Sequence, residues 1–545
     1  MTVNTPAPER DRDRARATTP PTGEPDPGAG PRRPRNPFAS REDRPTSAAA
    51  LLGKALLLGA ALALAVWGAF PLAEARNWFG LGVLAVATGL IFWVYLSRRL
   101  LPAKYLVPGT VFLIAFQIVP ILYTVSTAFT NFGDGHRGTK QEAVATIEEA
   151  SIAQVPGTPD YRLKVAVPRG ADPAEGPLAL LLTDPAAPAG ERVARPGEGI
   201  APVTDPGAFT PLTPEQAARR GGELADLRVE VEGGVLRAEG FTRAQITAPA
   251  RFHDEKADAI REPATGRVWT ADESTGNFVT ADGEKLGNGW KVNVGLKNFA
   301  DTLTNPTISK YFGQTLVWNL AFAVTTVLIT FGLGLFVALA LHHPRMRGKK
   351  IYRSLLILPY AMPAFAMLLV WADMFNQDFG LVNRLLGLSV NWLGEPWTAR
   401  LAVLVVQLWM GYPYMFLVST GALQSVPGEL KEAAQIDGAG RFTAFRKVTM
   451  PLVLVALFPL LVASFAFNFN NFNAIYLTTG GGPFPPDSPM AGATDLLITY
   501  TYRLAFGGQG AQYGLAAAIS LFIFVIVAVI SLVSFRRARA MEEVN

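Results

Sequence analysis

The chain has 545 residues, of which 50% are hydrophobic and 17% charged, and its formal net charge is +5. So apolar a composition, with only a weak basic excess, indicates a membrane protein with water-exposed parts and gives no reason to expect a nucleic-acid partner. The absence of cysteine excludes disulfides, thiol catalysis and zinc–thiolate sites.

Residues 1–47 contain much proline, arginine, aspartate and glycine and almost no large apolar side chain. Such a segment cannot bury a core, so we expect a disordered cytoplasmic tail. A basic arm that grips lipid or nucleic acid is the alternative, but Asp11 and Asp13 interrupt its arginines. The first apolar run follows this tail and has full span length, so we expect no cleavable signal peptide.

Long apolar runs account for most of the remaining chain, and a membrane span needs about 20 such residues. The sequence predicts eight spans, near residues 49–71, 77–97, 105–130, 313–341, 352–375, 401–421, 451–475 and 513–535. The predicted fold class is therefore an all-α polytopic membrane bundle, interrupted by one long insert. Spans one to three occupy 48–131, the insert 132–305, and spans four to eight 306–540.

Basic residues predict how the bundle is oriented. They gather between spans two and three, between four and five, between six and seven, and after span eight, as Arg98, Lys349, Arg446 and Arg536 illustrate. With eight spans, all of these segments lie on one side of the membrane, which the positive-inside rule makes the cytoplasmic side. Both termini are then cytoplasmic and the insert is extracytoplasmic.

The insert shows the alternation of apolar and polar residues that is typical of strands, separated by turn signals such as Gly233–Gly234. The strand-like runs are 161–167, 227–231, 268–270 and 290–294. We expect an independent, mainly β domain, with loops in the proline-rich stretch 172–213. His253 and Asp254 are interpreted as a surface pair rather than a metal site.

Prolines mark two of the predicted spans. Pro413 cannot donate a hydrogen bond to the carbonyl of Trp409, so an interruption of span six is expected near mid-depth. Irregular backbone at that depth is tolerated beside protein or a water-lined cavity. Pro359 and Pro363 are expected to bend span five in the same way. Kinks that serve helix packing alone are the alternative for all three.

The segment 427–451 between spans six and seven predicts a compact helix–turn–helix on the cytoplasmic side. Pro427 ends the preceding span, and the run 429–436 contains good helix formers. Gly438 and Gly440 allow a sharp turn, after which a second short helix starts near Thr443. Three charged side chains are expected to be exposed on this unit, namely Glu432, Asp437 and Arg441. An ordinary amphipathic loop is the alternative.

Span seven ends in the stretch 468–473, NFNNFN, which places four asparagines where hydrocarbon would disfavour bare amides. Helical spacing of i, i+3, i+4 and i+7 predicts that Ser464, Phe467, Asn468 and Asn471 share one face. A hydroxyl, two amides and an aromatic ring suit a sugar, since amides both donate to and accept from hydroxyls. Hydrogen bonds between helices explain the same residues, and the residues alone leave both readings open.

Several motifs resemble those of ABC-importer permeases. The loop carries Glu432-Ala433-Ala434, then Gly438, and closes on Val448-Thr-Met-Pro451, where that family has Ile-x-Leu-Pro. Four further stretches, 411–416, 464–471, 477–483 and 494–503, are similar to one branch, the larger permease subunits of maltose/maltodextrin importers. The likeness runs from about residue 50 to the end, and it matches the insert by position and size more than by sequence.

The resemblance implies two sites. The sugar site is implied to consist of Met410, Gly411, Tyr414, Ser464, Phe467, Asn468 and Asn471. The coupling surface for an ATPase is implied to consist of Glu432, Ala433, Ala434, Asp437, Gly438 and Arg441. Met410 stands where the branch has leucine, a change that should alter packing little.

The resemblance also implies partners and a mechanism. The chain would form a heterodimer with a smaller permease in the bacterial inner membrane, surrounded by lipid, with two ATPase subunits and an extracytoplasmic sugar-binding protein that contacts the insert and 476–512. The sequence has no G-x-x-x-x-G-K-[ST] phosphate loop, so ATP and Mg²⁺ would be bound by the ATPase partner and this chain is expected to be no enzyme and to hold no cofactor. The mechanism that the resemblance implies is binding-protein-dependent import by alternating access.

Other functions are possible on the same residues. The carried sugar could be trehalose or another oligosaccharide. An ion-coupled secondary transporter would want buried carboxylates, for which Asp373 and Asp378 are the nearest candidates, and it would leave the loop unexplained. A membrane-bound enzyme or receptor would need a catalytic cluster in the insert, and four histidines without cysteine offer little.

Overall fold

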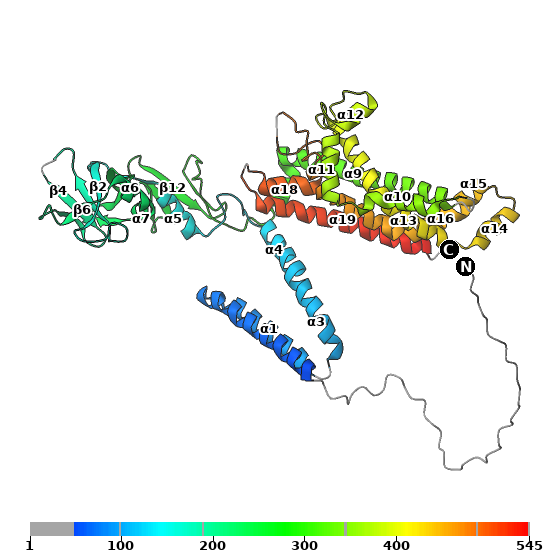
Figure 1. Ribbon diagram of the computed structural model, residues 1–545, viewed down its shortest axis with the longest axis horizontal. Coiled ribbons are helices and arrows are strands. Elements are labelled where there is room, and N and C mark those ends of the chain that lie inside the picture. Colours follow the sequence, from blue (N-terminus) through cyan, green and yellow to red (C-terminus); the bar gives the residue numbers. More distant parts are fainter. Residues whose placement is uncertain are drawn as a thin grey trace, which may run out of the picture. The chain divides into compact units, whose positions relative to one another are not determined.

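The computed structural model describes residues 48–97, 100–187, 190–342, 346–486, 489–508 and 510–542. The predicted tail 1–47 lies outside these residues. The chain divides into two compact units, one that ends at Ile114 and one that begins at Ala115 (Figure 1).

The first unit is helical. Helix α1 (Ala48–Glu74) and helix α2 (Trp78–Leu96) form an antiparallel hairpin, and α3 (Leu101–Leu113) follows. The side chain of Asn77 begins α2 by accepting a hydrogen bond from the backbone N–H of Gly80 over 2.9 Å. Large apolar side chains remain exposed along these helices, as expected for surfaces that face lipid or other spans.

Seven helices of the described residues are long and apolar enough to cross a membrane, or eight if one bent pair is a single span. The predicted eight spans are reached if the bent pair is counted as one. In the bent pair, Lys349–Ala361 and Ala364–Met374 meet at 89°, so the predicted bend of span five at its prolines is also confirmed. Its parts are α10 (Lys349–Ile357), a 3₁₀ turn (Leu358–Ala361) and α11 (Ala364–Met374).

The centre of the second unit is a helical bundle. Helix α9 (Pro306–His342) packs along α13 (Pro396–Ser425), and α16 (Met450–Phe469) lies against both α9 and α19 (Tyr513–Glu542) (Figure 1). The first two helices approach closely at Gly334, where an added Cβ would lie 2.6 Å from that of Met415. Close backbone packing of this kind is typical of membrane helices.

Helix α13 runs without a break through Pro413, so the predicted interruption of span six is wrong. Proline removes one hydrogen bond and crowds the preceding turn, and neighbouring helices in a bundle compensate for that loss. Pro413 is buried between such neighbours.

Further helices connect these elements. They are α4 (Val119–Ala128), reached from α3 through a π turn (Ile114–Ile118), α8 (Lys297–Thr304), α12 (Leu381–Leu386), α17 (Phe472–Tyr476) and α18 (Leu497–Phe506). Together with the long helices and the insert they confirm the fold class of a polytopic helical bundle with a mainly β insert.

The insert contains an antiparallel nine-stranded sheet of order β5-β4-β3-β2-β9-β8-β7, with β1 paired to β9 and β6 paired to β2. The strands are β1 (Ile152–Gln154), β2 (Tyr161–Pro168), β3 (Ala179–Thr183), β4 (Glu191–Arg195), β5 (Gly199–Pro202), β6 (Phe209–Pro211), β7 (Val229–Val231), β8 (Gly234–Glu239) and β9 (Arg243–Pro249). Alternate side chains such as Leu163, Leu182 and Leu236 point into its core, which α6 (Pro214–Arg219) and α7 (Gly221–Asp226) help to close.

A second, four-stranded sheet consists of β10 (Phe252–Asp254), β11 (Ala259–Glu262), β12 (Arg267–Asp272) and β13 (Asn277–Val279), and α5 (Lys140–Ala150) packs against it. The Nζ of Lys140 lies 2.5 Å from Asp258 and 5.0 Å from the ring centre of Trp290. The Nε2 of His253 lies 3.2 Å from the same aspartate, so this histidine belongs to a polar network of the insert.

Two expectations for the insert are wrong. The run 290–294 is not a strand: Trp290 is buried in the core of the smaller sheet, and only Asn293 makes an isolated bridge, to Thr130. The proline-rich stretch 172–213 contains four strands, β3 to β6, rather than loops alone. Two of its prolines, Pro202 and Pro211, stand at strand ends, where their missing N–H does no harm.

Candidate functional site

The asparagines of the predicted stripe lie where α16 ends. The helix stops at Phe469, before the predicted end of span seven, and Asn471 begins the next short helix, α17. Its Oδ1 accepts a hydrogen bond from the N–H of Ala474 over 3.2 Å. The prediction that Asn471 continues one face of span seven is therefore wrong, because a short amide side chain competes for backbone hydrogen bonds and favours helix caps.

Asn471 instead reaches α13. Its Nδ2 donates to Oε1 of Gln407 over 3.2 Å. Gln407 is buried, 7% exposed, and lies one helical turn before Met410 and Gly411. This glutamine was missed in the sequence, where the available signal was one uncharged polar residue in the apolar run 401–408. The bond is of the interhelical kind that the sequence left open as an alternative.

Ser464 and Asn468 form a second polar pair, on α16 itself. The Nδ2 of Asn468 donates to the carbonyl of Ser464 over 2.8 Å and lies 3.4 Å from its hydroxyl. The Oδ1 of Asn468 makes no hydrogen bond within the described residues. The ring of Phe467 is 69% exposed.

The remaining predicted residues are distributed around α13. Met410 packs in a cluster with Leu368 and Val406, whereas Tyr414 packs against the cluster of α9 and α16. A Cβ on Gly411 would lie 2.8 Å from Cγ2 of Thr330, so the missing side chain allows close packing of α9. Within the described residues no hydrogen bond joins Ser464 or Asn468 to α13. The structure thus contains two polar pairs, Asn471 with Gln407 and Asn468 with Ser464. A ligand role for the predicted residues stays a prediction.

A third buried amide fixes the end of α16. Asn319 of α9 is fully buried, donates from Nδ2 to the carbonyl of Phe469 over 3.0 Å, and accepts at Oδ1 from the N–H of Leu497 over 2.8 Å. It therefore ties the end of α16 to the start of α18. Asn319 is not among the predicted site residues, because nothing in its local sequence indicates its two distant partners.

The segment between α17 and α18 is held by a buried ion pair. Asp495 is fully buried and lies 3.0 Å from Arg503, and it also accepts from the N–H of Gly492 and the hydroxyl of Thr499, each over 2.8 Å. Burial raises the pKa of the Asp495 carboxyl, although Arg503 and the other donors act to lower it. This network gives the segment one defined shape.

The predicted helix–turn–helix lies at the end of the bundle opposite the segment between α17 and α18. Helix α14 (Gly428–Ile436) leads through Gly438, whose φ is +82°, into α15 (Arg441–Ala444), and a π turn (Phe445–Thr449) continues into α16. The expected charged residues Glu432, Asp437 and Arg441 are exposed. Ile436 and Phe442 are 86% and 74% exposed beside them. Exposed apolar and charged groups at one tip suit contact with another protein.

Comparisons with known proteins define the class first. Residues 302–542 match the family described as the inner membrane component of binding-protein-dependent transport systems, and residues 111–192 match the N-terminal part of the membrane subunit in such ABC transporters. With seven or eight apolar helices among its described residues, the chain is a multi-pass inner-membrane permease of the ABC transporter class, a class whose members are not enzymes themselves.

Relatives narrow the class further. The maltose/maltodextrin transport system permease protein MalF of Yersinia pestis is 33% identical over 84% of this chain and 88% of its own length. The MalF proteins of Salmonella typhi and Escherichia coli K12 are 35% and 34% identical over 82% and 86% of this chain and 89% and 92% of their own lengths. The chain belongs to the MalF family. Among solved structures, a bacterial ABC transporter involved in alginate import is similar with a TM-score of 0.40 and 23% identity over 45% of this chain and 84% of that one.

Proposed function

We propose that this chain is the larger permease subunit of an ATP-driven importer for maltose/maltodextrin-like sugars. The observation that carries the proposal is the identity of about one third with several MalF proteins, spread over more than four fifths of both chains. Similarity over that length includes the bundle, the insert and the loop between α13 and α16 together.

The partners in this proposal are a smaller permease, two ATPase subunits that bind ATP and Mg²⁺, and an extracytoplasmic sugar-binding protein. The exposed tip, where Ile436 and Phe442 lie beside charged residues, supports an ATPase contact, since apolar patches rimmed by polar residues mark sites of protein–protein contact. In the orientation that the basic residues predict, the tip and both termini are cytoplasmic. The insert and the segment before α18 then face the binding protein.

The coupling route follows from chain connectivity. The helix–turn–helix joins the end of α13 directly to the start of α16, and only the π turn separates α15 from α16. Closure of the ATPase subunits on Glu432–Arg441 would therefore displace two helices that carry the predicted sugar residues. Alternating access results if this displacement closes one side of the passage while it opens the other.

At the sugar site, the amides of Asn468 and Asn471 are proposed to bind sugar hydroxyls, with the ring of Phe467 against the apolar face of the pyranose. Asn471 would keep its bond to Gln407 and donate the second hydrogen of its amide to the sugar. A hydrogen bond to the protein replaces one that the sugar made with water, so its net free energy is small and binding stays weak enough for release.

The test is uptake by the complete importer in liposomes, with Asn468→Leu as the variant and the exposed Asn473→Leu as the control. We expect ATP-dependent maltodextrin uptake in the wild type and the control, and loss of uptake in Asn468→Leu although the complex still assembles. Unchanged uptake in Asn468→Leu would restrict the stripe to hydrogen bonding between helices. A panel that includes trehalose identifies the carried sugar, and dependence on ATP excludes an ion-coupled transporter.

A further inference from the structure

A large cleft lies at the end of α13 that is opposite the loop between α13 and α16, and none of the predicted sugar residues lines it. Its volume is about 1050 Å³, and its walls come from the start of α9, the start of α13 and the segment before α18. This is the size of a small-molecule site, for which clefts of about 300–1,000 Å³ are typical.

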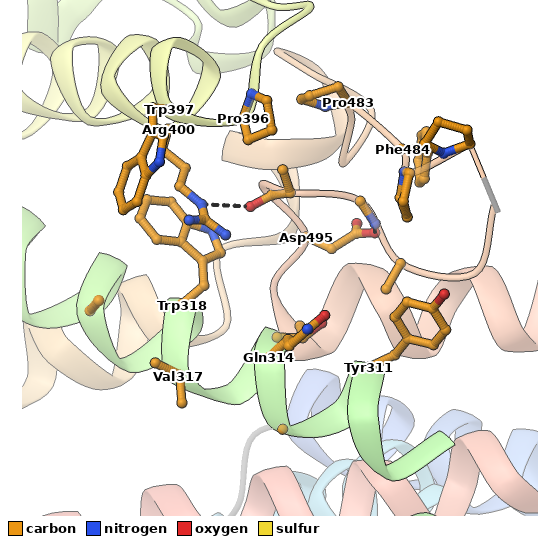
Figure 2. A pocket seen from close by; sticks show the side chains of 18 of the residues that line it. Tyr311, Gln314, Val317, Trp318, Pro396, Trp397, Arg400, Pro483, Phe484 and Asp495 are labelled. Atoms are coloured by element: carbon orange, nitrogen blue, oxygen red, sulfur yellow. Dashed lines mark hydrogen bonds between the residues drawn. The ribbon is translucent and has the colours of Figure 1, made fainter. Parts of the chain in front are cut away.

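Aromatic rings form much of the wall. Trp397 is 77% exposed and Phe484 is 39% exposed, whereas Trp318 is almost fully buried behind them. The guanidinium of Arg400 lies between the two indoles, 4.8 Å from the ring centre of Trp318 and 5.1 Å from that of Trp397 (Figure 2). The indoles are thus held in place, and Trp397 keeps surface for a ligand.

Polar groups face the same space with unused hydrogen-bonding capacity. Arg400 donates from Nε to the carbonyl of Ala493 over 2.8 Å, and within the described residues its terminal nitrogens have neither a hydrogen bond nor a carboxylate partner. In the same part of the chain, the side chain of Gln314 and the hydroxyl of Tyr311 also have no hydrogen-bond partner. A purely apolar occupant would leave all of these groups unpaired, which is unfavourable.

The remaining charges in the wall are neutralised. Asp495 lines the cleft but is engaged by Arg503, Gly492 and Thr499. Because Asp495 is fully buried and already paired, the charge that a ligand meets is that of Arg400, which disfavours a cation and donates hydrogen bonds to hydroxyl groups. A ligand with one apolar face and many hydroxyls matches exposed aromatic rings beside a guanidinium, an amide and a phenol.

The cleft is also aligned with the predicted sugar residues on α13. Arg400 precedes Gln407 by seven residues, and Gly411 and Tyr414 follow at helical spacing, so the four share one stripe of the helix. Seven residues of helix correspond to about 10 Å. A sugar in the cleft would lie two turns from the glutamine that holds Asn471.

We propose that this cleft is a second saccharide site, which holds a pyranoside against Trp397 and Phe484 with hydrogen bonds to Arg400 and Gln314. The inference rests on the proposed function, because it takes maltodextrin as the class of ligand. A sugar that enters from the external side would meet this site before it meets the polar residues of span seven.

The test measures equilibrium binding of radiolabelled maltotriose to the complete importer, purified without its external binding protein. Asn468→Leu removes the predicted site of span seven, so sugar bound by this variant reports the cleft. We expect one saturable site in Asn468→Leu. Adding Trp397→Ala should weaken it at least tenfold, and Gln314→Ala should weaken it several-fold. Trp78→Ala, which removes an equally exposed tryptophan of α2, should have no effect.

The outcomes separate the two proposals. If the wild-type importer transports maltotriose but Asn468→Leu binds none, the cleft is no saccharide site and the proposed function stands. Binding that is unchanged in both Trp397→Ala and Gln314→Ala also overturns the site and leaves Trp397 as a membrane-interface anchor. If the wild type neither transports nor binds maltotriose, the proposed function fails, and the cleft proposal fails with it.

Discussion

The side-chain amide of Asn471 donates to the side-chain carbonyl of Gln407 over 3.2 Å, and this bond joins the residue after span seven to the middle of α13. Both groups lie within the membrane-spanning bundle, where an unpaired amide is unfavourable. The same bond orients the one predicted sugar-site residue that lies beyond the end of α16. Gln407 is thus a positioning residue for Asn471.

Replacement of Gln407 tests that role. In Gln407→Leu the amide of Asn471 loses its acceptor, which should reduce stability by about 1–3 kcal/mol and leave Asn471 oriented only by its bond from the N–H of Ala474. We expect the KM for sugar uptake to rise several-fold in reconstituted importer, with a smaller change in maximal rate. Gln407→Glu keeps an acceptor oxygen and should retain much of the wild-type KM; equal defects in both variants would contradict the positioning role.

Asn319 should matter for stability rather than for sugar affinity. Asn319→Leu leaves the buried carbonyl of Phe469 and the buried N–H of Leu497 unpaired, at about 1–3 kcal/mol each. The expected result is a clear fall of the thermal unfolding temperature of the purified protein in detergent. Asn473→Leu, which changes an exposed asparagine, is the control, and a similar melting temperature in the two variants would count against the Asn319 bridge.

The two glycines of the helix–turn–helix should differ in how far substitution by valine impairs coupling to the ATPase. Gly438 has a φ of +82°, a conformation that costs a residue with a side chain about 1–2 kcal/mol, whereas Gly440 is extended with a φ of −62°. Neither has another atom within 4 Å of an added Cβ, so space does not distinguish them. We expect Gly438→Val to reduce sugar-dependent ATP hydrolysis by the complete importer while membrane insertion is intact, and Gly440→Val to be tolerated.

That comparison also tests the coupling surface. Because both variants add the same side chain to the same exposed loop, a defect confined to Gly438→Val locates the effect in the backbone turn. Normal coupling in Gly438→Val would mean that the ATPase does not rely on the shape of this tip.

The contact between the start of the insert and the start of α19 should depend on pH. A hydrogen bond from the backbone N–H of Ala511, together with one from Arg137, lowers the pKa of the Asp134 carboxyl below its ordinary value of 3.8. The stabilisation is therefore complete above pH 3.8 and is lost as the pH falls through the lowered pKa of the folded protein. Asp134→Asn should melt below the wild type at neutral pH, and the difference should vanish in acid.

The control for this pH dependence is Asp172→Asn, which removes a carboxylate whose hydrogen bond is confined to its own turn. We expect its melting temperature to follow the wild type across the same pH range. A constant difference between Asp134→Asn and the wild type from pH 7 into acid would show that the ionised carboxylate is not what stabilises the contact.

Features encoded by local pattern were predicted from the sequence. The spans follow from apolar runs, the strands at 161–167 and 268–270 from alternation, the bend of span five from its prolines, and the turn after α14 from Gly438. Each depends on residues close to one another in the chain, whose periodicity and backbone preferences act before any distant contact forms.

The features that only the tertiary structure decided depend on contacts between residues far apart in the sequence. Asn471 leaves the face of span seven because Gln407, 64 residues earlier, and the backbone of α17 bind its amide. Trp290 leaves its predicted strand for the core of the smaller sheet, α13 continues through Pro413 within its helical neighbours, and the cleft beside Arg400 needs three separate segments to form. Hydrogen bonds and packing between remote groups outweigh local preference there, because a buried polar group without a partner is more unfavourable than a shifted helix end.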